Sequence, residues 1–310
     1  ETDLGFSASL MKENSYTALQ LKPFWSVQDM RGTGTTPIFT VSEMKTAGYT
    51  GAELHGGNKG DSPIYSVTEL KDHFNLDILY PLYTVLELVG PDIENPLFNA
   101  TQLAGQGATD TNLKLVGFEI DDLIAAGFDE SDLKDDYTLN DLKVAGFDAT
   151  ALHDDFSLSE LVNVGFTLAQ LKEVPIGNDT KVYNVSLLKV HFSSQELFDG
   201  GFTISQLYEG GITDVQELHD IGVNVSQMKL LGYTPSELNT NTIYTLTEIK
   251  AGGYTATDFK NDANMNVQNS HDAGFTVAEM KAVGHTSGEL KGIYELTEIK
   301  AGGYTATDFK

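Results

Sequence analysis

Hydrophobic and polar positions recur along this chain in steps of mostly nine to eleven residues. Residues 39–48 read FTVSEMKTAG, and the same order returns at 137–146, 166–172, 202–211 and 275–284. The shared pattern is an aromatic residue, a small polar residue, two variable residues, an acid or amide, Leu, Met or Ile, often Lys, two more residues and Gly. Self-similarity at a fixed period indicates a repeat protein, so we read the chain unit by unit.

Each position in this pattern has a physical reason, which residues 39–48 illustrate. Thr40 is a preferred N-cap, and Glu43 lies three residues later, where it completes a capping box. Phe39 and Met44 then occupy the two positions of a hydrophobic staple. Gly48 supplies the left-handed residue that ends a helix. The sequence therefore predicts one helix of about two turns per repeat unit.

Such helices are too short to be stable alone, because helix nucleation costs more than a few hydrogen bonds return. The aromatic and Leu or Met positions need neighbouring units to cover them, so we expect the units to stack. The predicted fold is all-α: a solenoid of short two-turn helices, one per repeat unit, in a single continuous array over residues 1–310. Longer loops are expected at 31–38, 55–64, 89–97 and 173–182, which are rich in Gly, Pro, Asn and Asp.

Two further segments depart from a regular array. Residues 261–272 keep the spacing but lose the motif, so we read them as a degenerate unit. Residues 293–310 repeat residues 243–260 with one difference, Glu295 against Thr245. Either duplication of a block of five units or an artefact of an inferred sequence would produce this match. The chain starts at Glu1 without a Met and stops at Lys310 inside a unit, which suggests a piece of something longer.

The charge of the chain restricts its partners. The formal net charge is -26, from 45 Asp and Glu against 19 Lys and Arg. An acidic surface repels phosphate backbones and anionic lipids, so we expect neither nucleic acid nor a membrane surface as a partner. No run of about 18 apolar residues exists, so no membrane insertion is expected. The chain contains no Cys, which excludes a disulfide framework.

The FTxxELKxAG pattern resembles the tandem decapeptide repeats of the GFTAxELKxAG type in proteins of environmental microbes, protists and large viruses. The resemblance covers most of the chain. It implies a repetitive protein that is displayed on a surface or forms an assembly. It carries over no catalytic or binding residue.

No constellation of residues points to catalysis. None of the seven His forms an HExxH motif or a pair with metal-ligand spacing. His55, His153 and His219 follow the Leu of their units, where Lys usually stands, so we expect them on the surface. Most carboxylates fall at the third helical position, where capping explains them. We therefore predict no enzyme and no cofactor, and leave open weak surface binding of Ca²⁺.

Four Asn-x-Ser/Thr sequons are candidate sites of N-glycosylation. Asn99, Asn184 and Asn224 stand at expected N-caps, where a structural role suffices. Asn178 lies in a long loop and is the best candidate acceptor. Glycosylation would require secretion from a eukaryotic host.

The pattern favours a structural function. The last unit looks like an interior one, with Tyr304 at the aromatic position and Phe309 at the core position, and we take this as a candidate assembly end. Uncapped ends would join head to tail into a homopolymer. We therefore expect an extracellular filament, or one on a cell or virion surface, built from stacked copies or from one longer chain. The alternative is a solenoid scaffold that binds a protein, peptide or glycan.

Overall fold

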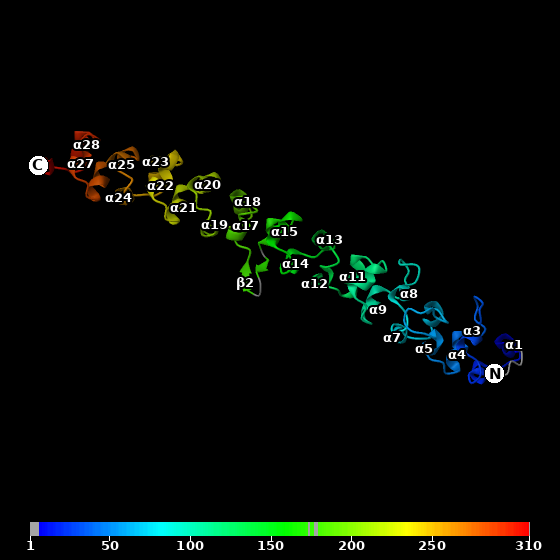
Figure 1. Cartoon of the computed structure of the whole chain (residues 1–310). Helices are drawn as coiled ribbons and strands as arrows, with labels where there is room; N and C mark the ends of the chain where they lie inside the picture. The colour runs from blue at the N-terminus through cyan, green and yellow to red at the C-terminus, as the bar shows by residue number, and fades with distance from the viewer. Residues whose placement is uncertain (1–5, 173, 177–178, 310) are drawn as a thin grey trace. The chain divides into compact units, whose positions relative to one another are not determined.

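A computed structural model describes residues 6–172, 174–176 and 179–309, and nearly all regular elements in this part of the chain are short helices, joined by turns (Figure 1). The chain divides into two compact regions, Glu1–Phe147 and Asp148–Lys310. The described helices of the first region are α1 Ala8–Glu13, α2 Ala18–Leu21, α3 Val27–Arg31, α4 Val41–Thr46, α5 Gly51–His55, α6 Val67–Leu70, α7 Leu76–Leu79, α8 Val85–Val89, α9 Ala100–Ala104, α10 Asp110–Leu115, α11 Ile120–Ala126, α12 Glu130–Leu133 and α13 Leu139–Val144.

The second region contains fifteen further described α-helices and two short 3₁₀ helices. They are α14 Ala149–Leu152, α15 Leu158–Asn163, α16 Leu168–Leu171, α17 Val185–Leu188, α18 Ser194–Asp199, α19 Ile204–Glu209, α20 Val215–Asp220, α21 Val225–Leu230, α22 Pro235–Asn239, η1 Thr240–Thr242, α23 Leu246–Ala251, α24 Ala256–Asn261, α25 Val267–Asp272, α26 Val277–Ala282, α27 Ser287–Leu290, α28 Leu296–Ala301 and η2 Ala306–Phe309. The all-α prediction is confirmed, with one helix per repeat unit.

The α4 unit shows why these residues form a helix of this length. Thr40 accepts a hydrogen bond from the Glu43 backbone N–H, and Glu43 accepts one from the Thr40 N–H, which confirms the predicted capping box. At the other end Gly48 has φ +79°, and the Tyr49 N–H donates to the Met44 carbonyl at 3.1 Å. This closure is a Schellman motif. Tyr49 therefore ends one helix and begins the next, which ties neighbouring units together.

Some units are one residue shorter because they end without a left-handed glycine. After α6 the Phe74 N–H donates to the Leu70 carbonyl at 3.0 Å, and after α7 the Tyr83 N–H donates to the Leu79 carbonyl at 3.0 Å. Lys71 and Tyr80, the C-cap residues of these helices, keep right-handed helical dihedral angles. The aromatic residue thus reaches the same core residue through a tighter turn, which explains the mixed spacing of the repeat.

Most of the long loops are closed at the base by the same bond that closes ordinary units. In three of the four loops the N–H of the next aromatic residue donates to the carbonyl of the preceding core residue: Phe39 to Met30 at 3.0 Å, Tyr65 to Leu54 at 3.2 Å and Phe98 to Leu88 at 3.2 Å. These insertions therefore leave the backbone hydrogen bond between neighbouring units unchanged. At the fourth loop the Tyr183 N–H donates to the Val174 carbonyl instead, at 3.3 Å. Within the predicted loop 173–182, β1 Pro175–Ile176 pairs antiparallel with β2 Asp179–Val182.

The unit that we read as degenerate still forms a helix. Asn266 caps α25, and Asn269 takes the place of the usual acid in a capping box. Ser270 occupies the core position and is buried, and its hydroxyl donates to the Asn266 carbonyl at 3.4 Å. Polar residues thus replace the motif chemically while the unit keeps its structure.

Helices pack on the second helix further along the chain as well as on their neighbours. In the first region these pairs include α1 with α3, α2 with α4, α5 with α7 and α9 with α11. In the second region they include α14 with α16, α17 with α19, α23 with α25 and α26 with α28. The Leu or Met at each core position is buried by these contacts, including Leu54, Leu103, Leu207 and Met280. Each unit therefore depends on others for its core.

Several units end in two adjacent glycines, and each of the two is required for a different reason. A Cβ on Gly252, the C-cap of α23, would lie 2.3 Å from Cγ1 of Val225, the first residue of α21. Gly302 meets Val277 in the same way, also at 2.3 Å. Gly253, by contrast, has φ +100° and no atom near its Cβ direction. The first glycine permits close packing of helices, and the second permits the left-handed turn.

We expect Gly252→Ala to destabilise the protein by ~1–3 kcal/mol, the usual cost of overpacking a filled site. In a Val225→Gly background the same change should cost much less, because Cγ1 and Cβ of Val225, which lie 2.3 and 2.5 Å from the added Cβ, are both gone. The equivalent positions of α2 and α4 hold Ala18 and Ala47, both buried. Urea unfolding of the four variants measures the coupling.

Gly253→Ala serves as the matched control for this cycle. It should cost ~1 kcal/mol in both backgrounds, because its penalty comes from backbone strain and not from contact with Val225. Equal costs of Gly252→Ala in the two backgrounds would contradict the packing explanation.

Candidate functional site: a joint repeated between units

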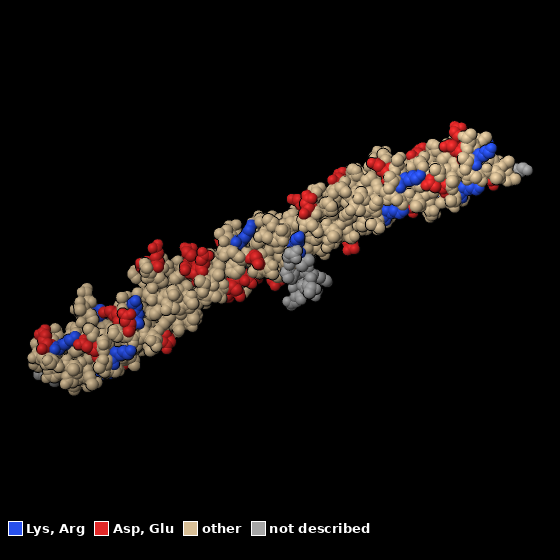
Figure 2. All heavy atoms as spheres, turned by 180° about the vertical axis from the view of Figure 1, so that it is seen from behind, with Lys and Arg blue, Asp and Glu red and all other residues tan. Residues whose placement is uncertain are grey.

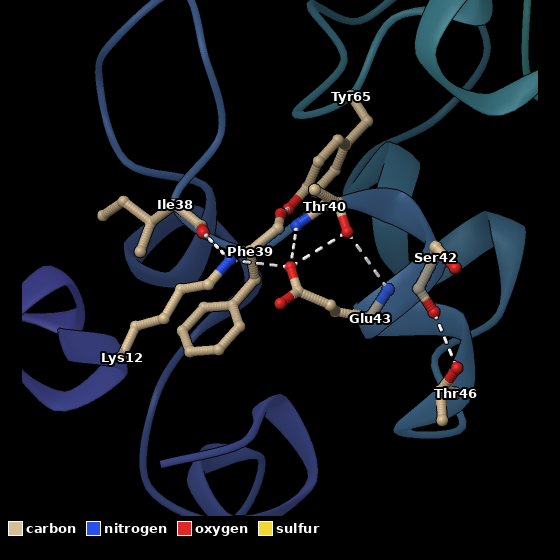
Figure 3. A network of polar contacts seen from close by, with 8 residues as sticks. All are labelled: Lys12, Ile38, Phe39, Thr40, Ser42, Glu43, Thr46 and Tyr65. Atoms are coloured by element: carbon tan, nitrogen blue, oxygen red, sulfur yellow. Dashed lines mark hydrogen bonds and ion pairs between the residues drawn. The ribbon is translucent and has the colours of Figure 1, made fainter. Parts of the chain in front are cut away.

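A lysine near the end of one helix contacts the aromatic residue three units further along, and Figure 3 shows the first example. The Lys12 ammonium lies 4.9 Å from the centre of the Phe39 ring, donates to the Ile38 carbonyl at 2.5 Å and pairs with Glu43 at 2.8 Å. Glu43 is also the capping-box acid of α4, accepting from the Thr40 N–H at 2.7 Å. One carboxylate therefore caps its own helix and holds a distant unit. We call this arrangement the inter-unit joint.

The inter-unit joint recurs in both regions. In the described residues a Lys or Arg lies over an aromatic ring in the pairs Lys22–Tyr49, Arg31–Tyr65, Lys45–Phe74, Lys114–Tyr137, Lys229–Tyr254, Lys250–Phe275 and Lys281–Tyr304. In most of them the ammonium also donates to the backbone carbonyl just before that aromatic residue, as Lys250 does to Gly274 at 2.6 Å. Cation–π contact, hydrogen bond and ion pair thus converge on one side chain.

Tyrosine hydroxyls form a second set of contacts between units. Tyr65 donates to the carbonyl of Phe39, two units earlier, at 2.8 Å (Figure 3). Tyr294 donates to the Phe275 carbonyl at 2.7 Å. Further described bonds of this kind join Tyr83 to Tyr65, Tyr244 to Val223, Tyr254 to Tyr233 and Tyr304 to His285. Burial raises the pKa of Tyr294 to about 12, so its hydroxyl keeps its proton and remains a donor at neutral pH.

Histidine takes the lysine position in three joints. The rings pack edge to face against the tyrosine three units along: His55 with Tyr83, His219 with Tyr244 and His271 with Tyr294, at centroid distances of 4.7, 5.0 and 4.8 Å. His55 is completely buried, so the expectation of a surface position is wrong for this residue. The loop 55–64 and the Tyr83 ring cover it, and contacts so distant along the chain were not visible in the local pattern.

The capping acids of the joints are held in their ionised form. Burial alone would raise the pKa of Glu43, but hydrogen bonds from Lys12 and Thr40 outweigh it and lower the pKa below the ordinary value of 4.5. The pKa of Glu279 is lowered in the same way, with burial opposed by Thr276 and Lys250. Figure 2 shows Lys and Arg side chains beside Asp and Glu on the surface, as these pairs require.

The sequons are placed as follows. Asn99, Asn184 and Asn224 are exposed N-caps, as expected, whose side-chain oxygens accept from backbone N–H groups at 2.9, 3.2 and 3.0 Å. Asn178 lies outside the described residues. The Ser186 hydroxyl also donates to the side-chain oxygen of Asn184 at 2.6 Å. Glycosylation of any of them stays a prediction.

The candidate assembly end shows the two residues in different environments. Tyr304 is buried and its hydroxyl bonds to the His285 carbonyl, whereas Phe309 is 44% exposed.

Within the described residues no group of three or more His, Asp or Glu side chains could hold a metal ion. None of the helices in the described part of the chain is long and apolar enough to cross a bilayer. Comparison with family models, with curated proteins and with solved structures finds no match to this chain.

The contribution of a joint can be measured with a lysine pair. Lys250→Met should lower the free energy of unfolding by ~1 kcal/mol, because it removes a cation–π contact and a charged hydrogen bond while keeping an apolar stem. Lys291→Met is the matched control, since the Lys291 ammonium has no partner among the described residues. It should change stability by less than ~0.5 kcal/mol in dilute solution. If urea titrations show the same loss of unfolding free energy in Lys250→Met and Lys291→Met, the joint does not stabilise the protein.

Acid should weaken the array through its capping carboxylates. Their folded-state pKa values are depressed, so the stability they contribute is complete above the ordinary value of 4.5 and is lost as pH falls below it. We expect the melting temperature to fall between pH 5 and 3 in the intact chain. Replacing Glu43 and Glu279 by Gln, which occupies this position in other units, should reduce that fall.

Glu130→Gln, at a half-buried position outside the capping acids, is the control for this pH series. It should leave the slope of melting temperature against pH unchanged. A double variant with the same acid sensitivity as the intact chain would show that other groups govern acid unfolding.

Proposed function

We propose that this protein is a structural repeat protein, a solenoid of short helices that assembles end to end into an extracellular or surface filament. The observation that carries the proposal is the inter-unit joint. It is made of two halves that recur along the chain: a cation that many units carry directly after the core residue, and an aromatic ring three units along. A contact of this kind between units of one chain can equally form between units of two chains.

The exposure of equivalent residues supports this proposal. Tyr16, in an early unit, is 45% exposed, whereas Tyr65 and Tyr83 at the same position of interior units are completely buried. Phe6 is 56% exposed. A unit that lacks neighbours thus leaves large apolar surface in water, which favours association. This holds for whichever unit stands at the end of an array.

An extracellular or surface location belongs to the same proposal. It is supported by the acidic charge of -26, which favours solubility, and by sequons at three exposed Asn residues. Glycans on Asn99, Asn184 or Asn224 would stand outside the joints, because these side chains take no part in them.

Purified protein decides between assembly and a monomeric state. We expect sedimentation velocity to show species that grow with protein concentration, and negative-stain electron microscopy to show linear particles longer than one chain. The driving surface is largely apolar and partly ionic, so moderate salt should weaken assembly without abolishing it. Discrete monomers at millimolar concentration would refute the filament.

A second candidate function is a scaffold that binds a protein, peptide or glycan partner. The observation in its favour is an open, mostly apolar groove lined by Pro63, Val67, Leu86, Pro91 and Leu97. Two of the long loops, 55–64 and 89–97, contribute to it, and Leu86 is 62% exposed. Saturable binding of one partner that is lost in Leu86→Asp, together with absence of self-association, would favour the scaffold.

A further inference from the structure

We propose that the joint of Lys189, in the second region, is a binding site for a ligand that carries an aromatic ring next to a positive charge. The ligand supplies the ring that this joint lacks. A binding site of this kind goes beyond the structural function proposed above and is independent of whether the chain forms filaments.

Lys189 keeps the position and the backbone contact of a joint cation. It directly follows Leu188, the buried core residue of α17, and its ammonium donates to the Gly211 carbonyl at 3.2 Å. The ammonium of Lys250 makes the same kind of bond in its own joint. Three units along from Lys189, however, the position of the aromatic residue is occupied by Ile212, which is buried. The cation is therefore in place without a ring to contact.

The acid of this joint is released from its usual contacts. In the joints of α4 and α26 the aromatic residue directly precedes the N-cap, but here Thr213 is inserted before the N-cap Asp214. Asp214 accepts from the Glu217 N–H at 2.9 Å, yet no return bond from the Glu217 carboxylate to the N-cap backbone and no ion pair with Lys189 occurs among the described contacts. This carboxylate accepts from the Ser194 hydroxyl of α18 instead. Cation and acid thus stand in one joint without pairing.

The groove at this joint is larger than its counterpart at a complete joint. It lies between α18 and α20 and has a volume of about 560 Å³, with Lys189 and Ile212 in its lining. The counterpart between α2 and α4, lined by Lys12 and its ring partner Phe39, has a volume of about 490 Å³. The same positions of the repeat line both grooves, so the exchange of an aromatic residue for Ile accounts for the wider space.

The chemistry of the lining defines the ligand. Phe192 and Ile221 provide apolar surface, and Lys189 is the cation of the lining. Three carboxylates also line the groove, those of Asp214, Glu217 and Asp220. An ammonium attracts the face of an aromatic ring, whereas carboxylates accept hydrogen bonds from cationic groups. An aryl ring therefore fits against Lys189, and a positive charge attached to it fits the carboxylates, which repel anions.

Isothermal titration calorimetry of the full 310-residue chain with tyramine tests the site. We expect a dissociation constant of about 1 mM or lower. Two relatives of tyramine separate the two halves of the ligand. 2-Cyclohexylethylamine has no aromatic face and should bind about fivefold more weakly, and 4-hydroxyphenylacetate, which is an anion, about tenfold more weakly or less well still. Equal binding of all three compounds, or no binding of tyramine, would overturn the proposal.

The same chemistry occurs in free arylalkylamines and in a peptide with an aromatic residue beside Lys or Arg. The peptide acetyl-GYKG-amide distinguishes these sources in the same titration. Tighter binding of the peptide than of tyramine assigns the site to a segment of a partner protein, and the reverse assigns it to a free amine.

Variants locate the binding in the groove. Ile212→Phe restores the missing ring and should abolish binding of tyramine. Lys189→Met should weaken binding about fivefold, the loss of one cation–π contact, and Lys189 is exposed, so this variant decides the question even if the filled one does not fold. Lys250→Met, which removes the cation of a complete joint, is the matched control and should leave binding unchanged. Unchanged binding in Lys189→Met would show that tyramine binds elsewhere, and the proposal would fall.

Discussion

The structure depends on one constraint: a helix of four to seven residues cannot pay its own nucleation cost in water. Capping boxes and Schellman closures reduce that cost but leave the core residue exposed. Burial of this residue requires other units, so stability is shared among them. Every feature of the repeat follows from the need to make that sharing reliable.

The inter-unit joint determines which units pack on one another and bury each other's core residues. A single acid such as Glu43 caps α4 and holds Lys12 from three units earlier, so local and distant structure are coupled through one carboxylate. These pairs are partly exposed, and each alone is worth little. Their repetition, together with the buried tyrosine hydroxyls, distributes specificity along the array and makes equivalent units interchangeable in their contacts.

Insertions and substitutions are tolerated where they leave this coupling intact. The loop 55–64 projects from a base where the Tyr65 N–H still meets the Leu54 carbonyl. Asn266 and Asn269 rebuild a capping box without Thr or Glu. Gly252 keeps its small size because Val225 fills the space that another unit leaves to alanine. The sequence therefore varies where the contacts between units are kept, even at positions where the repeat motif is lost.

The sequence by itself determined the local structure: where each helix begins and ends, which residue is its core position, and which acids act as caps. These features depend on contacts within about ten residues, so spacing alone specifies them. The tertiary structure decided that Lys250 meets Phe275, that His55 is buried against Tyr83, and that Phe309 is open while Phe259 is covered. These contacts join residues more than fifteen positions apart along the chain, across units of unequal length. A local pattern cannot specify them, because only packing in three dimensions determines which units meet.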